Sequence, residues 1–260
     1  MPPSNPPSES GFKYYTLRTL TLLKTWWLAL PVASSLTILI CTLATVFDAT
    51  RFFYDMGVCP GLIVRHTWPN IYHLLTAQWF HQNISTTLLN VLFFPPLNKM
   101  LETQRGSLHS VNFVLVVGFL GSAVYVGVEA LGYVLWGRES CMGGLGAVMY
   151  ALLTVEANEK AGAFKTRRIF GIPLPGALYP WLLLILSKLI LDSPFIYNLS
   201  GILVGLLYYI GALKFLFVPG RAWRWVEQRA PVRWIAKSGA FVRTPEESVA
   251  LPTTVDDVEG

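Results

Sequence analysis

Of the 260 residues in the chain, 53% are hydrophobic and only 13% are charged, and the formal net charge is +5. Water-soluble domains carry about a quarter charged residues, so this composition excludes an ordinary soluble domain. The apolar residues are gathered in long runs, which is typical of a protein that crosses a membrane.

The first apolar run, Trp26 to Phe47, contains 22 residues and no charge. It is long enough to cross a hydrocarbon core about 30 Å thick. No small-residue cleavage site follows it, so we expect a retained anchor rather than a removed signal peptide. Residues 1–25 form an N-terminal arm. Its first part, 1–11, is rich in Pro and Ser and predicts disorder, and 12–25 mix apolar and basic residues as an interfacial segment does.

Five further apolar stretches follow, and together with the first they predict six helical spans. They cover residues 79–98, 111–136, 141–157, 177–191 and 196–217. We therefore expect an all-α polytopic membrane protein in which residues 26–217 form a six-transmembrane-helix bundle. Residues 218–260 are expected to be a cytosolic tail. It carries three tryptophans among five basic residues between Arg221 and Lys237, which favours a membrane-surface helix broken at Pro231.

The placement of Lys and Arg predicts the orientation of the chain. Sixteen of these residues fall in the N-terminal arm, the 2–3 and 4–5 loops and the tail, whereas three (Arg51, Arg65 and Arg138) fall on the opposite side. Cytosolic loops carry the excess of Lys and Arg, so both termini are expected in the cytosol. The basic charge is therefore explained by topology and does not indicate nucleic-acid binding.

The 1–2 loop, residues 48–78, mixes apolar residues with prolines. Such a loop cannot face lipid with unpaired backbone groups, so we expect it to lie against other spans. Cys59 and Cys141 both fall on the non-cytosolic side, where a disulfide between them is one alternative. Two free thiols shielded by the membrane are the expectation.

Four short stretches combine polar or small residues with the predicted spans. The first is residues 79–90, with His81, Gln82, Asn83, Thr86, Thr87 and Asn90. Polar side chains inside a membrane are expected to face protein or a water-filled cavity. The second is Leu101 to Ser107, where the second span ends. The third is the glycine-rich Gly143 to Gly146, and the fourth is Asn198 to Gly205, whose Gly201-x-x-x-Gly205 spacing lets a neighbouring helix approach closely.

Together these stretches resemble the rhomboid family of intramembrane serine proteases, over roughly residues 28–215. The second span of that family has the pattern H-x-x-x-x-H-x-x-x-N followed by E-x-x-x-G-S. His81, Asn90, Glu102, Gly106 and Ser107 match it. The fourth span opens with G-x-S-G, which the Gly143 and Gly144 segment resembles. The sixth carries H-x-x-G-x-x-x-G, to which Asn198, Gly201 and Gly205 align. Residues 90–107 and 166–180 look closest to fungal Golgi rhomboids.

The catalytic positions of this pattern are substituted. The serine position falls on Gly146, or on Leu145 if the alignment shifts by one residue, and the histidine position is Asn198. The middle histidine of the second span, which helps to hold the oxyanion in the family, is Thr86. A serine hydroxyl needs an adjacent base to become nucleophilic, so the resemblance implies the fold and argues against the protease chemistry.

A different nucleophile could stand in for the missing serine. Cys141 with His81 as its base is one alternative, although a boundary cysteine and a buried histidine are the simpler interpretation. Lys188 lies inside a span, where charges are often functional. Asp192 follows at i+4, which favours a simple ion pair. Glu129 lies near the non-cytosolic end of the third span, and for it too a simple structural role is favoured over a functional one. No metal-ligand spacing is present, and we expect neither metal nor cofactor.

The resulting hypothesis is a rhomboid-fold pseudoprotease of the endoplasmic reticulum or Golgi membrane. His81, Asn83, Asn90 and Asn198 are the expected binding residues for transmembrane client proteins, and Glu102, Gly106, Gly143, Gly144, Gly201 and Gly205 the expected structural ones. Further expected partners are membrane lipids and quality-control or trafficking machinery, such as a ubiquitin ligase. The alternatives are an active intramembrane protease with a non-standard nucleophile and a small-solute transporter that uses Lys188 and Glu129.

Overall fold

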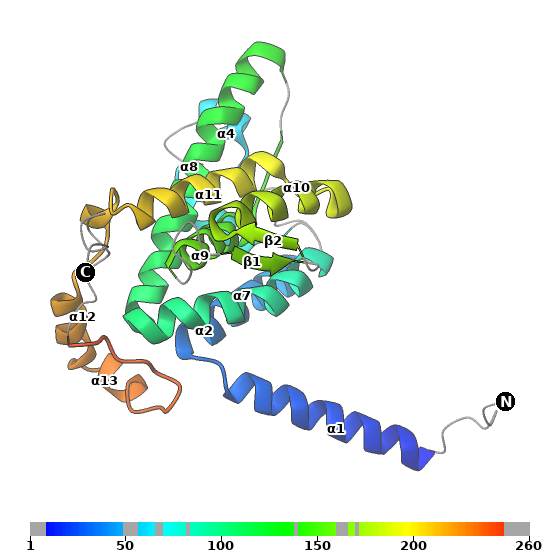
Figure 1. Cartoon of the computed structure of the whole chain (residues 1–260), viewed down its shortest axis with the longest axis vertical. Coiled ribbons are helices and arrows are strands. Elements are labelled where there is room, and N and C mark those ends of the chain that lie inside the picture. Colours follow the sequence, from blue (N-terminus) through cyan, green and yellow to red (C-terminus); the bar gives the residue numbers. More distant parts are fainter. Residues whose placement is uncertain are drawn as a thin grey trace.

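The computed structural model describes residues 9–48, 57–65, 70–81, 84–137, 140–159, 166–169 and 172–246 (Figure 1). These parts are predominantly helical. One antiparallel hairpin, β1 (Thr166–Ile169) and β2 (Ile172–Pro175), interrupts the helices, with Thr166 opposite Pro175 and Ile169 opposite Ile172. This hairpin lies in the basic 4–5 loop, and the helical fold class predicted from the sequence is confirmed.

One main helix corresponds to each of the six expected spans. They are α2 (Val32–Asp48), α7 (Ile84–Arg105), α8 (Ser107–Trp136), α9 (Gly146–Glu159), α10 (Tyr179–Leu191) and α11 (Phe195–Tyr209). Contacts between their ends show an alternating chain direction. Arg105 at the end of α7 pairs with Glu159 at the end of α9, and His109 in the first turn of α8 lies 2.9 Å from the Tyr208 hydroxyl near the end of α11. The start of α8 therefore lies at the same end of the bundle as the ends of α7, α9 and α11. A hydrogen bond from the Ala33 amide to Glu102, near the end of α7, places the start of α2 there too.

By length and hydropathy, α8 is the one described helix able to cross a bilayer alone. Helix α11 passes the same test only when joined with η3 (Lys214–Leu216) and α12 (Gly220–Glu227), and a bend of 93° separates these segments. The residues of α2 and α10 form shorter apolar helices. Outward-facing apolar side chains on α2, α7, α8 and α10 nevertheless leave a surface suited to lipid. They include Leu36, Leu43, Leu88, Leu92, Leu131, Leu135, Ile185 and Leu189.

The N-terminal segment differs from the sequence prediction at its boundary. A separate helix, α1 (Glu9–Leu28), contains Trp26 and Trp27 and extends away from the bundle (Figure 1). The residue before a proline is disfavoured in helical conformation, and the break at Leu30–Pro31 separates α1 from α2 for this reason. The expected first span therefore begins at Val32 rather than Trp26. Residues 9–11 form the first turn of α1, and residues 1–8 lie outside the described part of the chain, so disorder of the arm stays a prediction.

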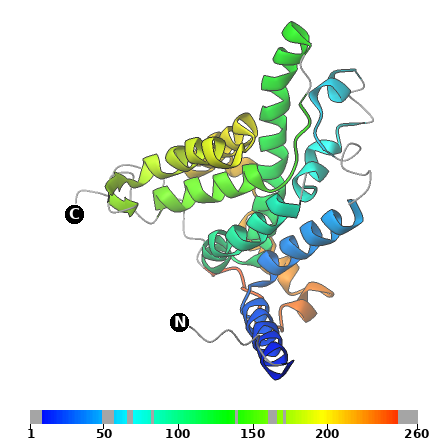
Figure 2. The ribbon, with the colours of Figure 1, turned by 90° about the vertical axis from the view of Figure 1, so that its right-hand side faces the viewer.

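The 1–2 loop packs against the bundle, as its mixed composition predicts. Its helices α4 (Pro60–Arg65) and α6 (His73–Thr76) contact α8, and η1 (Ala77–Trp79) follows α6 (Figure 2). Val58, Ile63, Leu74 and Ala77 are buried against Tyr125 and Tyr197. Burial of these side chains holds the loop in place.

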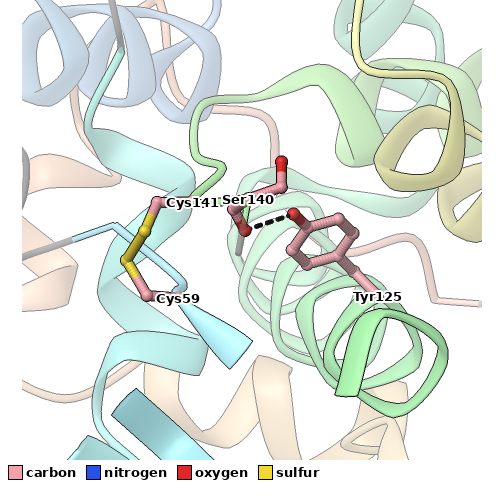
Figure 3. The surroundings of a disulfide bond; sticks show 4 residues. All are labelled: Cys59, Tyr125, Ser140 and Cys141. Atoms are coloured by element: carbon pink, nitrogen blue, oxygen red, sulfur yellow. Dashed lines mark hydrogen bonds between the residues drawn. A yellow bond between two sulfur atoms is a disulfide. The ribbon is translucent and has the colours of Figure 1, made fainter. Parts of the chain in front are cut away.

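A disulfide fastens this loop to the segment before α9. Cys59 and Cys141 are bonded, so the expectation of two free thiols is wrong (Figure 3). Val58 and Met142, the neighbouring residues, exchange two backbone hydrogen bonds of 2.8 and 2.9 Å. The Tyr125 hydroxyl donates to the Ser140 carbonyl at 2.7 Å (Figure 3). The sequence left this pairing as an alternative because it shows no contact that brings two residues separated by 82 positions together.

The closest helix packing in the described bundle joins α9 and α11. A Cβ atom added to Gly201 would overlap the backbone of Ala147, and one added to Gly205 would lie 2.8 Å from the Ala151 carbonyl oxygen. Small residues at this spacing let two helix backbones approach where larger side chains would separate them. The contact starts one residue beyond Gly146 and therefore aligns the first turn of α9 with the first turn of α11.

The replacement Gly201→Ala is predicted to destabilise the protein because its methyl group has no room against the Ala147 backbone. We expect a loss of roughly 1–3 kcal/mol, measured as a lower midpoint of thermal unfolding in detergent. Gly127→Ala on α8 is the matched control, since nothing lies within 4 Å of its added Cβ. Alanine is the better helix former, so the control should be neutral or slightly stabilising. Equal midpoints for the two variants would contradict this packing.

Candidate functional site

A buried carboxylate organises the end of the bundle at which α7 ends and α8 begins. Glu102 is fully buried and accepts four hydrogen bonds. They come from the Ala33 and Ser34 amides at 2.8 and 3.1 Å, and from the Ser34 and Ser107 hydroxyls at 2.9 and 2.7 Å. The first amides of a helix have no partner within it, and the positive end of the helix dipole favours a negative charge. Glu102 therefore caps α2 and holds α8 at the same time.

Asn98 extends this network by one turn of α7. Its Nδ2 donates to the Ser34 hydroxyl at 2.9 Å, and its Oδ1 accepts from the Ser110 hydroxyl at 2.8 Å. Asn98, Ser34 and Ser110 are all buried. Their hydrogen bonds join α2, α7 and α8, so each polar group is compensated for the loss of water.

The C-terminal segment is bound to the same network. Residues 240–244, here called the clasp, run past the starts of α2 and α8. The Val32 amide donates to the Ala240 carbonyl at 3.0 Å, and the Ser107 amide donates to the Val242 carbonyl at 2.8 Å. In return, the Val242 amide donates to the Ser107 hydroxyl at 3.0 Å. The clasp therefore satisfies helix N-terminal groups that would otherwise need water.

Gly106 and Glu227 secure the far end of the clasp. Gly106 has a φ of 96°, and a Cβ there would lie 2.9 Å from the Thr244 Cα. Glycine is required for both its left-handed conformation and the close approach. Glu227 of α12 accepts hydrogen bonds from the Thr244 amide and hydroxyl at 2.9 and 2.7 Å.

Removal of the Glu102 carboxylate is predicted to destabilise the whole end of the bundle. Glu102→Ala leaves four donors without their acceptor, and each buried donor left unpaired costs about 1–3 kcal/mol. We expect a large fall in the thermal unfolding midpoint, with faster hydrogen exchange at residues 32–34 and 240–244. Asp192→Asn is the control, because that side chain is exposed and asparagine tolerates the left-handed conformation found there (φ 48°). If the clasp amides stayed as protected in Glu102→Ala as in the control, the carboxylate would not hold them.

A second group of candidate residues meets where α9 and α11 begin. Gly146 faces Asn198, so that a Cβ added at Gly146 would overlap the Asn198 Oδ1. The Asn198 Nδ2 donates to the Ser193 hydroxyl at 2.6 Å, and the Tyr197 hydroxyl donates to the Gly144 carbonyl at 2.9 Å. Asn198 is only 2% exposed. Residues 146 and 198, which the motifs single out, therefore lie directly opposite each other.

His81 approaches the same junction from the segment before α7. Its Nε2 accepts a long hydrogen bond of 3.4 Å from the Leu145 amide. Gly144 has a φ of 97°, and a Cβ there would lie 2.9 Å from the His81 ring. The Gly144 amide also donates to the Ala77 carbonyl at 2.7 Å. A glycine at position 144 therefore lets the imidazole reach the start of α9.

The other polar residues of the 79–90 stretch differ in burial. Thr87 is buried, Asn90 is half-buried and Thr86 is exposed on α7. Gln82 and Asn83 lie outside the described residues. Tyr197 and Ser193 were not predicted as members of the junction. The position of Tyr197 directly before Asn198 was a usable signal, but the contact of Ser193 depends on the turn between α10 and α11.

Two other candidates have simple structural partners. Cys141 is part of the disulfide, so its sulfur is not a thiolate. Lys188 forms an i,i+4 ion pair with Asp192 at 2.5 Å, and both side chains are substantially exposed. The hydrogen bond from Lys188 is the main cause that lowers the pKa of the Asp192 carboxyl below its usual value.

Comparison with known proteins places these residues in a family. The family model "Rhomboid domain" matches residues 69–215, which is more than half of the chain. "Rhomboid-type serine protease 2" of Neurospora crassa is 30% identical over 230 residues, covering 85% of this chain and 80% of that protein. A protein with the same name from Gibberella zeae is 32% identical over 169 residues, covering 62% of this chain and 60% of that protein.

A plant relative shows the same likeness over a longer protein. "Rhomboid-like protein 15" of Arabidopsis thaliana is 25% identical over 235 residues, covering 85% of this chain. This chain spans only 55% of the length of that relative. The matched region contains the helices from α6 to α11 and both parts of the Gly146–Asn198 junction. The chain is an integral membrane protein and belongs to the rhomboid family.

Proposed function

We propose that this rhomboid-family chain binds transmembrane segments of other membrane proteins without cleaving them. The observation that carries the proposal is the pairing of Gly146 with Asn198. Position 146 has no side chain, and the group that faces it is an amide. The first turns of α9 and α11 are held together as a reacting pair would need, but neither residue supplies a reacting group.

Proteolysis by a serine enzyme requires a hydroxyl and a base that accepts its proton. Gly146 cannot supply the hydroxyl. Asn198 is neutral and has no lone pair that becomes protonated near neutral pH, and its Nδ2 already donates to Ser193. Loss of one member of such a pair can lower the rate by about a million-fold. A third group is also missing, because Thr86 stands where the family has the histidine that helps to hold the oxyanion.

The rival hypothesis is an active protease with a non-standard nucleophile, and the names of the fungal relatives favour it. Three residues near the junction could be considered for that nucleophile, and none is suited to the role. Cys141 is bonded to Cys59, and the Ser200 hydroxyl donates to the Tyr197 carbonyl at 2.7 Å. Leu145, the other position considered for the serine, has an apolar side chain buried in the core. These contacts support the inactive interpretation.

Binding of a client segment is supported by the polar character of the junction. Ser193 and Gly146 are half-buried and flank Asn198, and His81 lies on the other side of Gly144. A transmembrane helix with polar side chains cannot satisfy them in lipid, so it gains hydrogen bonds from such a site. Asn90 is a second polar group for such contacts. A binding role for Asn83 stays a prediction, since this residue lies outside the described part of the chain.

The cellular setting of the proposal follows from charge and composition. The positive-inside distribution of Lys and Arg supports cytosolic termini, which would place the clasp and the Glu102 network at the cytosolic end. The resemblance of residues 90–107 and 166–180 to fungal Golgi rhomboids supports a location in the endoplasmic reticulum or Golgi. Clients in transit there, together with quality-control or trafficking machinery, are the proposed partners.

The proposal predicts binding without cleavage. Purified protein in nanodiscs should bind a fluorescent transmembrane substrate of an active rhomboid, measured by anisotropy, and leave it intact on a gel. Asn198→Leu with Asn90→Leu should weaken binding several-fold, because two hydrogen-bonding groups are lost. Thermal unfolding identifies any variant that fails to fold, and Asn198→Asp is the second variant because it keeps the size of the side chain. Gly127→Ala is the binding control. Wild-type affinity in the folded double variant would contradict the proposed site.

Restoring the family residues tests the missing chemistry. Gly146→Ser alone should remain inactive because no imidazole stands at position 198. Gly146→Ser with Asn198→His supplies both groups, yet Thr86 still leaves the oxyanion poorly stabilised, so we expect weak cleavage at most. Steady cleavage by the unmodified protein would overturn the proposal.

A further inference from the structure

The segment after α11 presents large apolar and basic side chains to solvent. Helix α12 and the short helix α13 (Val232–Ile235) carry exposed Trp225, Trp234 and Ile235, at 58%, 75% and 50% exposure. Exposed cations surround them. This patch, here called the Trp–Arg surface, consists of Arg221, Trp225, Arg229, Arg233, Trp234, Ile235 and Lys237. Tryptophans left this exposed in a folded segment mark an interaction surface.

The inner side of α12 is already occupied by contacts within the chain. Glu227 is buried and binds Thr244, and Arg224 donates to the Pro245 and Glu246 carbonyls at 2.7 and 3.0 Å. The one acidic side chain between residues 221 and 237 is therefore turned inward. The outer side is left strongly basic, and the Arg229 guanidinium lies 4.6 Å from the centre of the Trp225 ring.

The position of this surface relative to the bundle is set by two connections. The clasp ties the segment to the first residues of α2 and α8 through Val32 and Ser107. At its other end, the chain bends by 93° between the end of α11 and the segment Lys214–Glu227, which contains η3 and α12. A helix that turns at right angles to a membrane-crossing helix, at the level where other such helices begin, runs along the membrane surface. Phe215, 80% exposed at this turn, suits the apolar edge of the interface.

We propose that the Trp–Arg surface binds the anionic phospholipid headgroups of the bilayer that holds the protein. Tryptophan rings and arginines are enriched at the boundary between headgroups and acyl chains, where the ring is partly buried and the cation stays hydrated. Each Lys or Arg near an anionic surface contributes about 1 kcal/mol, which is roughly a factor of five in binding. The headgroups are the acidic partner nearest to this surface, and no second protein is needed to supply the charge.

The test measures how deeply the segment lies in the interface. A spin label is attached to Ser238→Cys in the full-length chain, with the buried Cys41 replaced by alanine. The protein is placed in nanodiscs of phosphatidylcholine alone, or of an equal mixture of phosphatidylcholine and phosphatidylserine. Collision of the label with oxygen, which concentrates in lipid, is compared with collision with a water-soluble nickel complex. With phosphatidylserine we expect the ratio to shift toward oxygen, and high salt should reverse the shift.

Charge variants separate this surface from a general effect of charge. Arg221→Glu with Arg233→Glu should abolish the shift, since loss of the two cations alone is worth about 25-fold. Arg18→Glu with Lys24→Glu makes the same change of charge at exposed positions of α1 and should preserve the shift. Trp234→Ala should lower the ratio of oxygen to nickel collisions in both lipid mixtures, because insertion of the ring does not depend on headgroup charge. Thermal unfolding shows whether each variant is folded. If the double variant does not fold, reversal of the shift by salt in the labelled protein without charge changes still tests the proposal.

Three results would overturn the proposal. They are an equal ratio in the two lipid mixtures, persistence of the shift in Arg221→Glu with Arg233→Glu, and a shift that appears only when a soluble acidic protein is added. The last result would assign the surface to a protein partner instead.

Discussion

The close backbone contact between α9 and α11 is the constraint on which the candidate site depends. Gly201 and Gly205 lie against Ala147 and Ala151, where no larger side chain fits. Because the contact begins beside Gly146, it brings the first turns of the two helices together and places Gly146 opposite Asn198. The side chains at the junction are thus positioned by two glycines that take no part in its chemistry. A chain can keep such a scaffold after the reacting groups have changed, because packing and reactivity depend on different residues.

The two ends of the bundle are stabilised in different ways. At one end, Glu102 binds the starts of α2 and α8, and the clasp from the C-terminal segment completes their hydrogen bonds. At the other end, the Cys59–Cys141 disulfide and the Val58–Met142 pair hold the 1–2 loop beside the start of α9. The second arrangement also keeps His81 near Gly144, since the Ala77 carbonyl accepts from the Gly144 amide. The junction is therefore supported by both the loop and the helix pair.

The sequence predicted the helical class and the family because both can be recognised from short-range sequence patterns. Apolar runs locate α2 and α7 to α11, and the spacing from Asn198 through Gly201 to Gly205 places three residues along one helix face. Contacts between distant segments were not accessible in this way. The disulfide, the clasp at Ser107 and the approach of Ser193 to Asn198 each depend on how loops return to the bundle. The error at Trp26 has a local cause, because Pro31 ends α1 inside a run whose hydrophobicity is continuous.

We propose that the Gly146–Asn198 junction holds the first turns of α9 and α11 together without a reactive nucleophile. The most direct test treats the unmodified protein in membranes with a serine-directed fluorophosphonate probe and locates any adduct by mass spectrometry. The serine protease of Neurospora crassa that matches the chain provides the positive control. We expect labelling of the control and no adduct on any serine of this chain. A stoichiometric adduct on one serine, lost when the protein is unfolded beforehand, would show an activated nucleophile and contradict it.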